Sequence, residues 1–193
     1  MRAFCCPSSY AHQLLSWYDK AHRVLPWRIS PQHPALEADP YCVWLSEIML
    51  QQTTVKTVTS YYLHFIKKWP TLSALAQAKQ EDILKAWAGL GYYSRARNLH
   101  ACAQTICAHY NGHFPRDLKQ LQKLPGIGSY TASAICAIAF AMPVAVVDSN
   151  VERIITRLFC LERPIKNLKK QIHHYTQALT PTHHAGDFAQ AMM

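Results

Sequence analysis

Apolar side chains recur at three-, four- and seven-residue steps along most of the chain, a spacing that is typical of amphipathic α-helices. Two helices are predicted between residues 43 and 69, and the proline-containing segment 29–41 is predicted to be a loop. The pattern therefore favours an all-α fold. Further helices are predicted at 8–23, 71–79, 81–87, 98–106, 115–123, from 130, from about 150 to 160, and at 167–179 and 187–193.

The segment Leu124-Pro-Gly-Ile-Gly128 joins two of these predicted helices. Gly126 and Gly128 allow positive φ angles and close approach of the backbone, and the N–H groups that they expose would lie at the start of the helix that opens at Tyr130. Such a helix N-terminus binds anions, and a phosphate group suits it. The alternative is a helix corner that binds no ligand.

An acidic residue follows in Val144-Ala-Val-Val-Asp-Ser-Asn-Val-Glu-Arg153. Ser149 and Glu152 have the spacing of a capping box, which predicts a helix that begins near Asn150. Asp148 would then lie just outside a positive helix end, which favours its ionised form and leaves its carboxylate free to act. A phosphate-binding turn followed by a free carboxylate indicates chemistry on a nucleic-acid backbone or its sugar.

Glu47 lies in the apolar segment Trp44-Leu-Ser-Glu-Ile-Met-Leu50. Apolar surroundings disfavour the charged form of a carboxyl group, and a glutamic acid that keeps its proton can act as a general acid. The alternative is a solvent-exposed helix residue, because helical spacing places the polar residues Gln51 and Thr54 on the same face as Glu47.

A second glycine-containing segment, Gly89-Leu-Gly-Tyr-Tyr-Ser-Arg-Ala-Arg97, precedes a predicted helix. Glycine pairs at helix corners allow the backbone to approach a bulky ligand. Tyr92 and Tyr93 beside Arg95 and Arg97 combine aromatic rings with phosphate-binding cations, which suits DNA. The alternative is a pair of core tyrosines next to a solvated basic helix face.

The charge balance favours a polyanionic partner. Lysine and arginine number 20 against 11 acidic residues, which gives a formal net charge of +9 and a pI of about 9.3. The seven cysteines include no C-x-x-C pair, so we expect reduced thiols and no metal site formed by these residues. The sequence shows no signal-peptide core and no membrane-length apolar run. A soluble, cytoplasmic protein is expected.

The glycine turn and the acidic segment together resemble the helix-hairpin-helix GPD (HhH-GPD) superfamily of DNA glycosylases. Leu124-Pro-Gly-Ile-Gly128 is similar to its hairpin turn, and Asp148 falls at the position of its catalytic aspartate. The resemblance implies an all-α fold of two lobes. A six-helix, barrel-like lobe would comprise residues 29–143 and contain the helix-hairpin-helix at 121–140. A second, incomplete lobe would comprise residues 1–28 and 144–193.

Further stretches are similar to one branch, the adenine DNA glycosylases of the MutY type. The resemblance implies a double-stranded DNA partner with adenine opposite 8-oxoguanine or guanine, bound by a monomer. The stretches are Leu25-Pro-Trp-Arg28, Trp44-Leu-Ser-Glu-Ile-Met-Leu-Gln-Gln-Thr53, Trp87-Ala-Gly-Leu-Gly-Tyr-Tyr-Ser-Arg-Ala-Arg-Asn-Leu-His100 and Phe188-Ala-Gln-Ala-Met-Met193.

The resemblance also implies catalytic roles. Glu47 would protonate the adenine, Asp148 would stabilise the oxocarbenium-like sugar, and Tyr130 and Asn150 would hold Asp148 in place. Tyr130 stands where the endonuclease III branch carries a lysine, and a phenol cannot form a Schiff base with the sugar. A monofunctional N-glycosylase is therefore implied.

DNA-contacting positions follow from the same resemblance. Gln52 and Tyr92 would enter the gap left by a flipped-out base, while Trp27 and Arg28 would line the base pocket. The remaining positions that match the branch are Gln51, Thr53, Leu90, Gly91, Arg95, Arg97, Leu124, Gly126, Ile127 and Gly128.

The sequence also departs from the branch. Ser149 replaces the glycine that is usual after the catalytic aspartate, and the four cysteines of a 4Fe–4S cluster and an 8-oxoguanine-reading domain are expected beyond residue 193. We therefore expect no iron absorbance. We also expect an apolar patch at Leu14, Leu15 and Trp17 that helix 187–193 is too short to cover. The alternatives are a non-catalytic DNA-binding remnant and an endonuclease III-like glycosylase.

Overall fold

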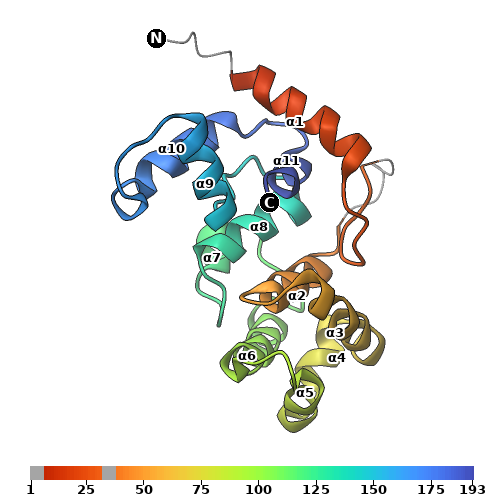
Figure 1. Ribbon diagram of the computed structural model, residues 1–193. Helices are drawn as coiled ribbons and strands as arrows, with labels where there is room; N and C mark the ends of the chain where they lie inside the picture. Colours follow the sequence, from red (N-terminus) through yellow and green to blue (C-terminus); the bar gives the residue numbers. More distant parts are fainter. Residues whose placement is uncertain (1–6, 32–37) are drawn as a thin grey trace. The chain divides into compact units, whose positions relative to one another are not determined.

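The computed structural model describes residues 7–31 and 38–193, with side chains described from residue 9 onwards. The described residues form eleven α-helices and one short 3-10 helix and contain no β-strand (Figure 1), so the predicted all-α fold is confirmed. No helix in these ranges combines the length and the apolarity that a bilayer span requires. Residues 32–37 of the predicted loop lie outside the described residues.

The chain divides into two compact units. Unit 2 comprises Val24–Arg28 and Ala38–Ala132. Its helices are α2 (Pro40–Leu50), α3 (Val55–Lys68), α4 (Leu72–Gln77), α5 (Gln80–Trp87), α6 (Tyr93–His109) and α7 (Leu118–Leu121).

Short polar side chains begin several helices of unit 2. The Asp39 carboxylate accepts a hydrogen bond from the Tyr41 N–H at 2.8 Å, and Pro40 occupies the first position of α2. Thr54 and Thr71 cap α3 and α4 in the same way. Such a cap stabilises a helix by about 1 kcal/mol. The predicted loop therefore ends earlier than expected, because Asp39 and Pro40 already form a helix start.

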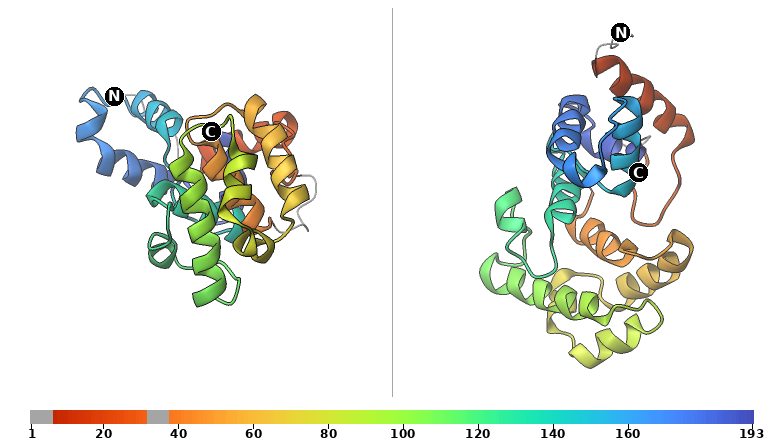
Figure 2. Two further views of the ribbon diagram at one scale, coloured as in Figure 1. Left: turned by 90° about the horizontal axis from the view of Figure 1, so that it is seen from below. Right: turned by 60° about the vertical axis from the view of Figure 1, so that its left-hand side comes forward.

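The core of unit 2 surrounds α2, whose residues Tyr41 and 43–49 are all buried. Helix α2 packs against α3 and α6, and α6 also packs against α4 and α5 (Figure 2). Fully buried aromatic rings fill the space between these helices: Phe65 meets Trp87 edge-on, with ring centroids 5.8 Å apart. This packing holds the turns between the helices in fixed positions.

Unit 1 comprises Met1–Arg23, Ile29–Glu37 and Ser133–Met193. In its described part, α1 packs against α10 and α11, and α9 packs against the same two helices. The elements are α1 (Pro7–Ala21), α9 (Ser149–Leu158), a 3-10 helix (Ile165–Asn167), α10 (Lys169–Leu179) and α11 (Ala185–Met192). Its core consists of Ala11, Val151, Ile155, Leu168, Ile172, Leu179, Phe188 and Met192.

The apolar face of α1 is better covered than the sequence predicted. Leu14 and Leu15 are half-buried and pack against the core that includes Phe188 and Met192 of α11. The predicted open patch is therefore partly covered at these two positions, because α11 begins at Ala185 rather than residue 187 and α10 also packs against α1. The side chain of Trp17 is 54% exposed.

The units differ from the predicted lobes in three places. Residues 29–31, predicted to belong to the six-helix lobe, belong to unit 1. Trp27 and Arg28 belong to unit 2, where the Trp27 ring meets Tyr62 edge-on at 5.3 Å between centroids. Residues 133–143 belong to unit 1, and the boundary between the units lies within α8 (Ser129–Phe140).

Candidate functional site

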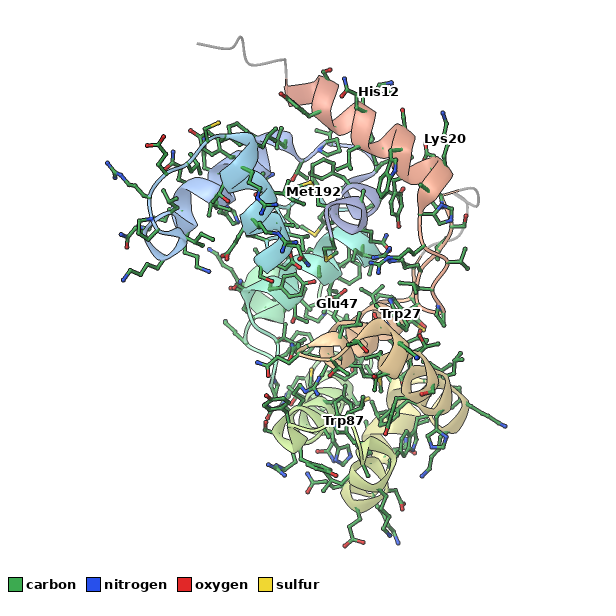
Figure 3. All side chains as sticks on the ribbon, viewed as in Figure 1. His12, Lys20, Trp27, Glu47, Trp87 and Met192 are labelled. Carbon is green, nitrogen blue, oxygen red and sulfur yellow. The ribbon has the colours of Figure 1, made fainter. Side chains whose placement is uncertain are left out.

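Glu47 lies in the middle of α2, and its side chain is only 8% exposed (Figure 3). The buried residues of the same helix are mostly apolar, and Trp44 contacts Phe114 edge-on at 5.5 Å between centroids. The alternative of a solvent-exposed glutamate is therefore wrong. Gln51, predicted to share its face, is half-buried and donates a hydrogen bond to the Thr131 hydroxyl at 3.5 Å.

The turn that follows α2 places a glutamine outside the core. Helix α2 ends at Leu50, and Thr54 begins α3. Between them Gln52 is exposed and adopts a left-handed backbone conformation, with φ of 56°. Such a conformation costs a non-glycine residue about 1–3 kcal/mol, so the surrounding structure must hold it in place.

The turn between α5 and α6 has a similar character. Gly89 has φ of +105°, and a Cβ atom there would lie 2.1 Å from the Tyr61 hydroxyl oxygen, so only glycine fits. Gly91 also has a positive φ of +70°, and Tyr92 follows with φ of 47°. Tyr92 is 63% exposed and Tyr93 is 42% exposed, so the alternative of core tyrosines is wrong.

Arg95 on α6 connects these two turns. Its guanidinium Nη1 donates to three backbone carbonyl oxygens at the end of α2, those of Ile48 (3.0 Å), Met49 (3.1 Å) and Gln51 (2.6 Å). Its Nη2 donates to the Thr53 hydroxyl (3.3 Å) and to the carbonyl oxygens of Leu90 (2.9 Å) and Gly91 (3.3 Å).

This bonding differs from the predicted role of Arg95 as a phosphate-binding cation. Its two terminal nitrogens are occupied by backbone carbonyl oxygens and the Thr53 hydroxyl, while its buried Nε has no hydrogen-bond partner among the described residues. The guanidinium carbon lies 5.3 Å from the ring centroid of Trp87 and 5.7 Å from that of Tyr92. Burial lowers the pKa of Arg95 from its ordinary value, but an arginine side chain stays charged in a protein even when it is partly buried. Arg97, two residues further on, is exposed to solvent.

The glycine turn between α7 and α8 has the predicted shape in part. Leu124 and Ile127 are buried, and Gly126 has φ of +74°. A Cβ atom on Gly126 would lie 2.8 Å from Cβ of Asn98 on α6, so the turn packs closely against that helix.

Gly128 does not use the positive φ that a glycine allows. Its carbonyl oxygen accepts a hydrogen bond from the Ala132 N–H at 2.9 Å, so Gly128 directly precedes α8 and accepts the first hydrogen bond of that helix. The first N–H groups of an α-helix have no partner within the helix, which suits an anion, and phosphate binding at the start of α8 stays a prediction. Tyr130 lies in this first turn and is half-buried.

In unit 1, Asp148 is itself the N-cap of α9. One carboxylate oxygen accepts from the Val151 N–H at 2.8 Å, and the other accepts from the Asn150 side-chain amide at 3.0 Å. The predicted capping box with a free Asp148 is therefore wrong. Ser149 is the first helical residue and its side chain is exposed, because the aspartate one position earlier satisfies the helix start.

Gln177 on α10 holds the segment that leads to Asp148. Its side-chain oxygen accepts from the Ala145 N–H at 2.9 Å, and its side-chain nitrogen donates to the Pro143 carbonyl at 2.8 Å. Neither a motif nor a hydrophobic pattern identifies this contact, because Gln177 is one of several polar residues on an exposed helix face.

Trp27 is buried at 8% exposure, and its neighbour Arg28 is half-buried. Both residues belong to unit 2, in its short first segment Val24–Arg28. The edge-on contact with Tyr62 places the Trp27 ring on α3. The structure therefore brings Trp27 into the core beside Tyr62, and its predicted role in a base pocket stays a prediction.

Cysteines in the described part of the chain form no metal-binding group. Among the residues described, no three His, Cys, Asp or Glu side chains gather as metal ligands would. Cys102 and Cys136 are buried, and Cys160 is exposed. Burial raises the pKa of the Cys102 thiol to about 12, so it stays protonated near neutral pH.

A family model described as the HhH-GPD superfamily of base excision DNA repair proteins matches residues 45–181. This chain belongs to that superfamily. The match includes both glycine-containing turns, Glu47 and Asp148.

Adenine DNA glycosylases are similar to this superfamily member over most of its length. The protein of Homo sapiens is 44% identical over 190 residues, which cover 96% of this chain and 35% of the human protein. That of Buchnera aphidicola subsp. Baizongia pistaciae is 38% identical over 181 residues, covering 93% of this chain and 50% of the relative. That of Mycolicibacterium smegmatis is 47% identical over 145 residues, covering 75% and 47%. The chain thus spans about a third to a half of the length of these relatives.

Solved structures of the same superfamily share this fold. A thermostable thymine-DNA glycosylase aligns with a TM-score of 0.83 at 27% identity, covering 96% of this chain and 83% of the other. A trapped endonuclease III–DNA covalent intermediate aligns with a TM-score of 0.75 at 23% identity, covering 94% and 80%.

Proposed function

We propose that this chain is a monofunctional DNA N-glycosylase that removes adenine paired with 8-oxoguanine or guanine from double-stranded DNA. The observation that carries the proposal is a glutamate, Glu47, buried at 8% exposure in an apolar helix. Its similarity to adenine DNA glycosylases over 93–96% of the chain in the human and Buchnera proteins supports the choice of base.

Glu47 is proposed as the general acid. Adenine is a poor leaving group as an anion, and proton transfer to its ring nitrogen lets it leave as a neutral base. Apolar surroundings favour the protonated form of a carboxyl group, which is the form that can donate. A buried position also keeps competing water away from the acid. The burial of Glu47 on α2 supports this role.

Asp148 is proposed to stabilise the positive charge that develops on the sugar. Its two oxygens are fixed by the Val151 N–H and the Asn150 amide, so the carboxylate needs no reorganisation during the reaction. The N-terminus of α9 favours a negative charge at this position. Asn150 is thereby a direct orienting partner, and Tyr130 is proposed to assist. Water then completes the hydrolysis, as in other two-carboxylate glycosidases.

Three turns of unit 2 are proposed to bind the DNA. The Leu124–Gly128 turn and the start of α8 would hold a phosphate, while the exposed Gln52 and Tyr92 would fill the gap left by the flipped-out adenine. The net charge of +9 favours the approach of a polyanion. We propose that one copy of the chain binds one duplex.

The proposal is tested by measuring the rate of adenine release from a duplex that carries adenine opposite 8-oxoguanine, with the protein in excess over the DNA. Glu47→Gln should lower the rate by about 10²–10⁴-fold, the usual contribution of a general acid, while duplex affinity changes little. Glu81→Gln is the matched control, because Glu81 is exposed on the first turn of α5.

Two outcomes would contradict the proposal. A wild-type rate in Glu47→Gln would remove Glu47 from the mechanism. A wild-type chain that binds the duplex and releases no adenine would favour the non-catalytic DNA-binding function instead.

A further inference from the structure

The two turns with left-handed residues share one side chain. Arg95 bonds the carbonyl oxygen of Gln51, which belongs to the peptide group directly before Gln52. It also bonds the carbonyl oxygen of Gly91, which belongs to the peptide group directly before Tyr92. The orientation of a peptide plane fixes ψ on one side and φ on the other. One guanidinium group therefore fixes the orientation of the peptide group that precedes each of the two left-handed residues, Gln52 and Tyr92.

Other contacts reinforce this arrangement. The Tyr92 ring lies against the guanidinium group, with 5.7 Å between its centroid and the guanidinium carbon. A cavity of about 30 Å³ adjoins Arg95 and extends to the close-packed glycine turn, since it is lined by Gln51, Asn98 and Gly126. Arg95 therefore lies where the end of α2, the start of α6 and the hairpin turn meet.

We propose that Arg95 is a positioning residue, which sets the spacing and direction of Gln52 and Tyr92 so that both enter the duplex at the extruded base. This inference rests on the proposed function. The planar guanidinium suits the task because its two terminal nitrogens point to two different turns at once. A lysine ammonium of similar charge is a single point and cannot hold both sets of carbonyl oxygens. Arg95 acts through Gln52 and Tyr92 rather than on the reacting atoms.

The competing role is a direct phosphate contact. A phosphate-binding arginine contributes to the salt dependence of DNA affinity, with a change in slope of about 0.9 for each phosphate neutralised. A positioning residue leaves that slope unchanged and alters the extrusion of the base. In a variant that keeps the positive charge, extrusion of the base is therefore the readout that separates the two roles.

The experiment compares Arg95→Lys with wild type in the full chain. Arg163→Lys is the control, because Arg163 is an exposed arginine of unit 1 outside the proposed machinery. Duplex affinity is measured at several salt concentrations, and extrusion is followed by the fluorescence of 2-aminopurine placed at the target adenine. Adenine release is measured in a single turnover. Urea unfolding establishes that each variant is folded.

We expect Arg95→Lys to keep the salt slope and to lose about 30- to 100-fold in base release, with a smaller fluorescence rise, because a displacement of about 1 Å has an effect of this size. Unchanged extrusion and release would overturn the proposal. A direct phosphate contact predicts this same unchanged extrusion and release, because lysine neutralises a phosphate as arginine does.

The wild-type chain separates this inference from the proposed function. If wild type releases no adenine, the proposed glycosylase function fails, while the fluorescence comparison still decides the role of Arg95. If Arg95→Lys does not fold, Thr53→Val removes the hydroxyl that Arg95 contacts at 3.3 Å and leaves its carbonyl bonds in place. A fall in extrusion of severalfold in that variant supports the proposal, and wild-type extrusion contradicts it.

Discussion

Asp148 carries two tasks that substitution can separate. It begins α9 by accepting the Val151 N–H at 2.8 Å, and it is the proposed stabiliser of a cationic sugar. Serine is as good a helix N-cap as aspartate, whereas alanine provides no acceptor and costs about 1 kcal/mol, within a range of about 0.5–2 kcal/mol. Asp148→Ser and Asp148→Ala therefore remove the same charge and differ in the cap.

The expected magnitudes follow from the hydrogen bonds. Asp148→Ala should lower the free energy of unfolding by about 1–2 kcal/mol, because the Val151 N–H and the Asn150 amide both lose their acceptor. Asp148→Ser should lose about half of that, since its hydroxyl still accepts from Val151. Both variants should lose at least about 100-fold in adenine release, the size of effect seen when one preorganised electrostatic partner is removed.

Urea unfolding gives the stability of each variant, and single-turnover adenine release with excess protein gives the activity. Ser149→Ala is the control, because Ser149 is exposed and should contribute less than about 0.5 kcal/mol. Equal unfolding free energies for the serine and alanine variants, or a large loss for Ser149→Ala, would refute Asp148 as the cap. Release above about a tenth of wild type in Asp148→Ser would refute its catalytic role, since a tenfold effect corresponds to only about 1.4 kcal/mol.

Further expectations concern single positions. Borohydride should trap no protein–DNA adduct, because position 130 offers a phenol, and a stoichiometric adduct would favour an endonuclease III-like reaction. Gly126→Ala should destabilise the chain by about 1–3 kcal/mol in urea unfolding, because of its positive φ and the 2.8 Å approach to Asn98, and wild-type stability would contradict that packing. Burial raises the Cys102 pKa from 9.0 to about 12, so the folded thiol binds its proton more tightly than the unfolded one. The resulting stability is fully present below pH 9 and falls as the pH rises from 9 to 12; Cys102→Ala should flatten the pH dependence in that window, measured as the denaturant midpoint, and an unchanged slope would refute the assignment.

The helix periodicity and the long motifs carried most of what could be predicted. Amphipathic spacing predicts the helices because burial of one face is what stabilises them. Most described helices lie near the predicted ranges, whereas α6 (Tyr93–His109) is longer than predicted and α7 (Leu118–Leu121) is shorter. The buried position of Glu47 was one of two alternatives in the sequence. The structure decides for the buried position, because α2 is buried on all faces. That burial depends on packing against α6, which is distant in sequence and could not be read from the α2 pattern.

Other features required the three-dimensional structure. A capping-box pattern favoured Ser149 as the cap, but Asp148, one residue earlier, is the N-cap of α9. Arg95 looked like a phosphate ligand because charge and neighbouring tyrosines suggest one, whereas its partners are backbone carbonyl oxygens, which leave no trace in the sequence. The role of Gln177 could not be predicted from the sequence for the same reason, since its side chain also bonds main-chain atoms.

The two hydrogen bonds from the Gln177 side chain to the backbone of residues 143 and 145 have a consequence for the order of folding. Its partners Ala145 and Pro143 lie 32 and 34 residues away in sequence, so the segment before Asp148 is fixed only after α10 has docked. Contacts of such separation form late, because the intervening chain must first lose its freedom. A nascent or partly unfolded chain would then hold the turns of unit 2 that are proposed to bind DNA already formed, while Asp148 is still loosely placed. Competence for chemistry would then be acquired in the final step of maturation, after the ability to engage a duplex.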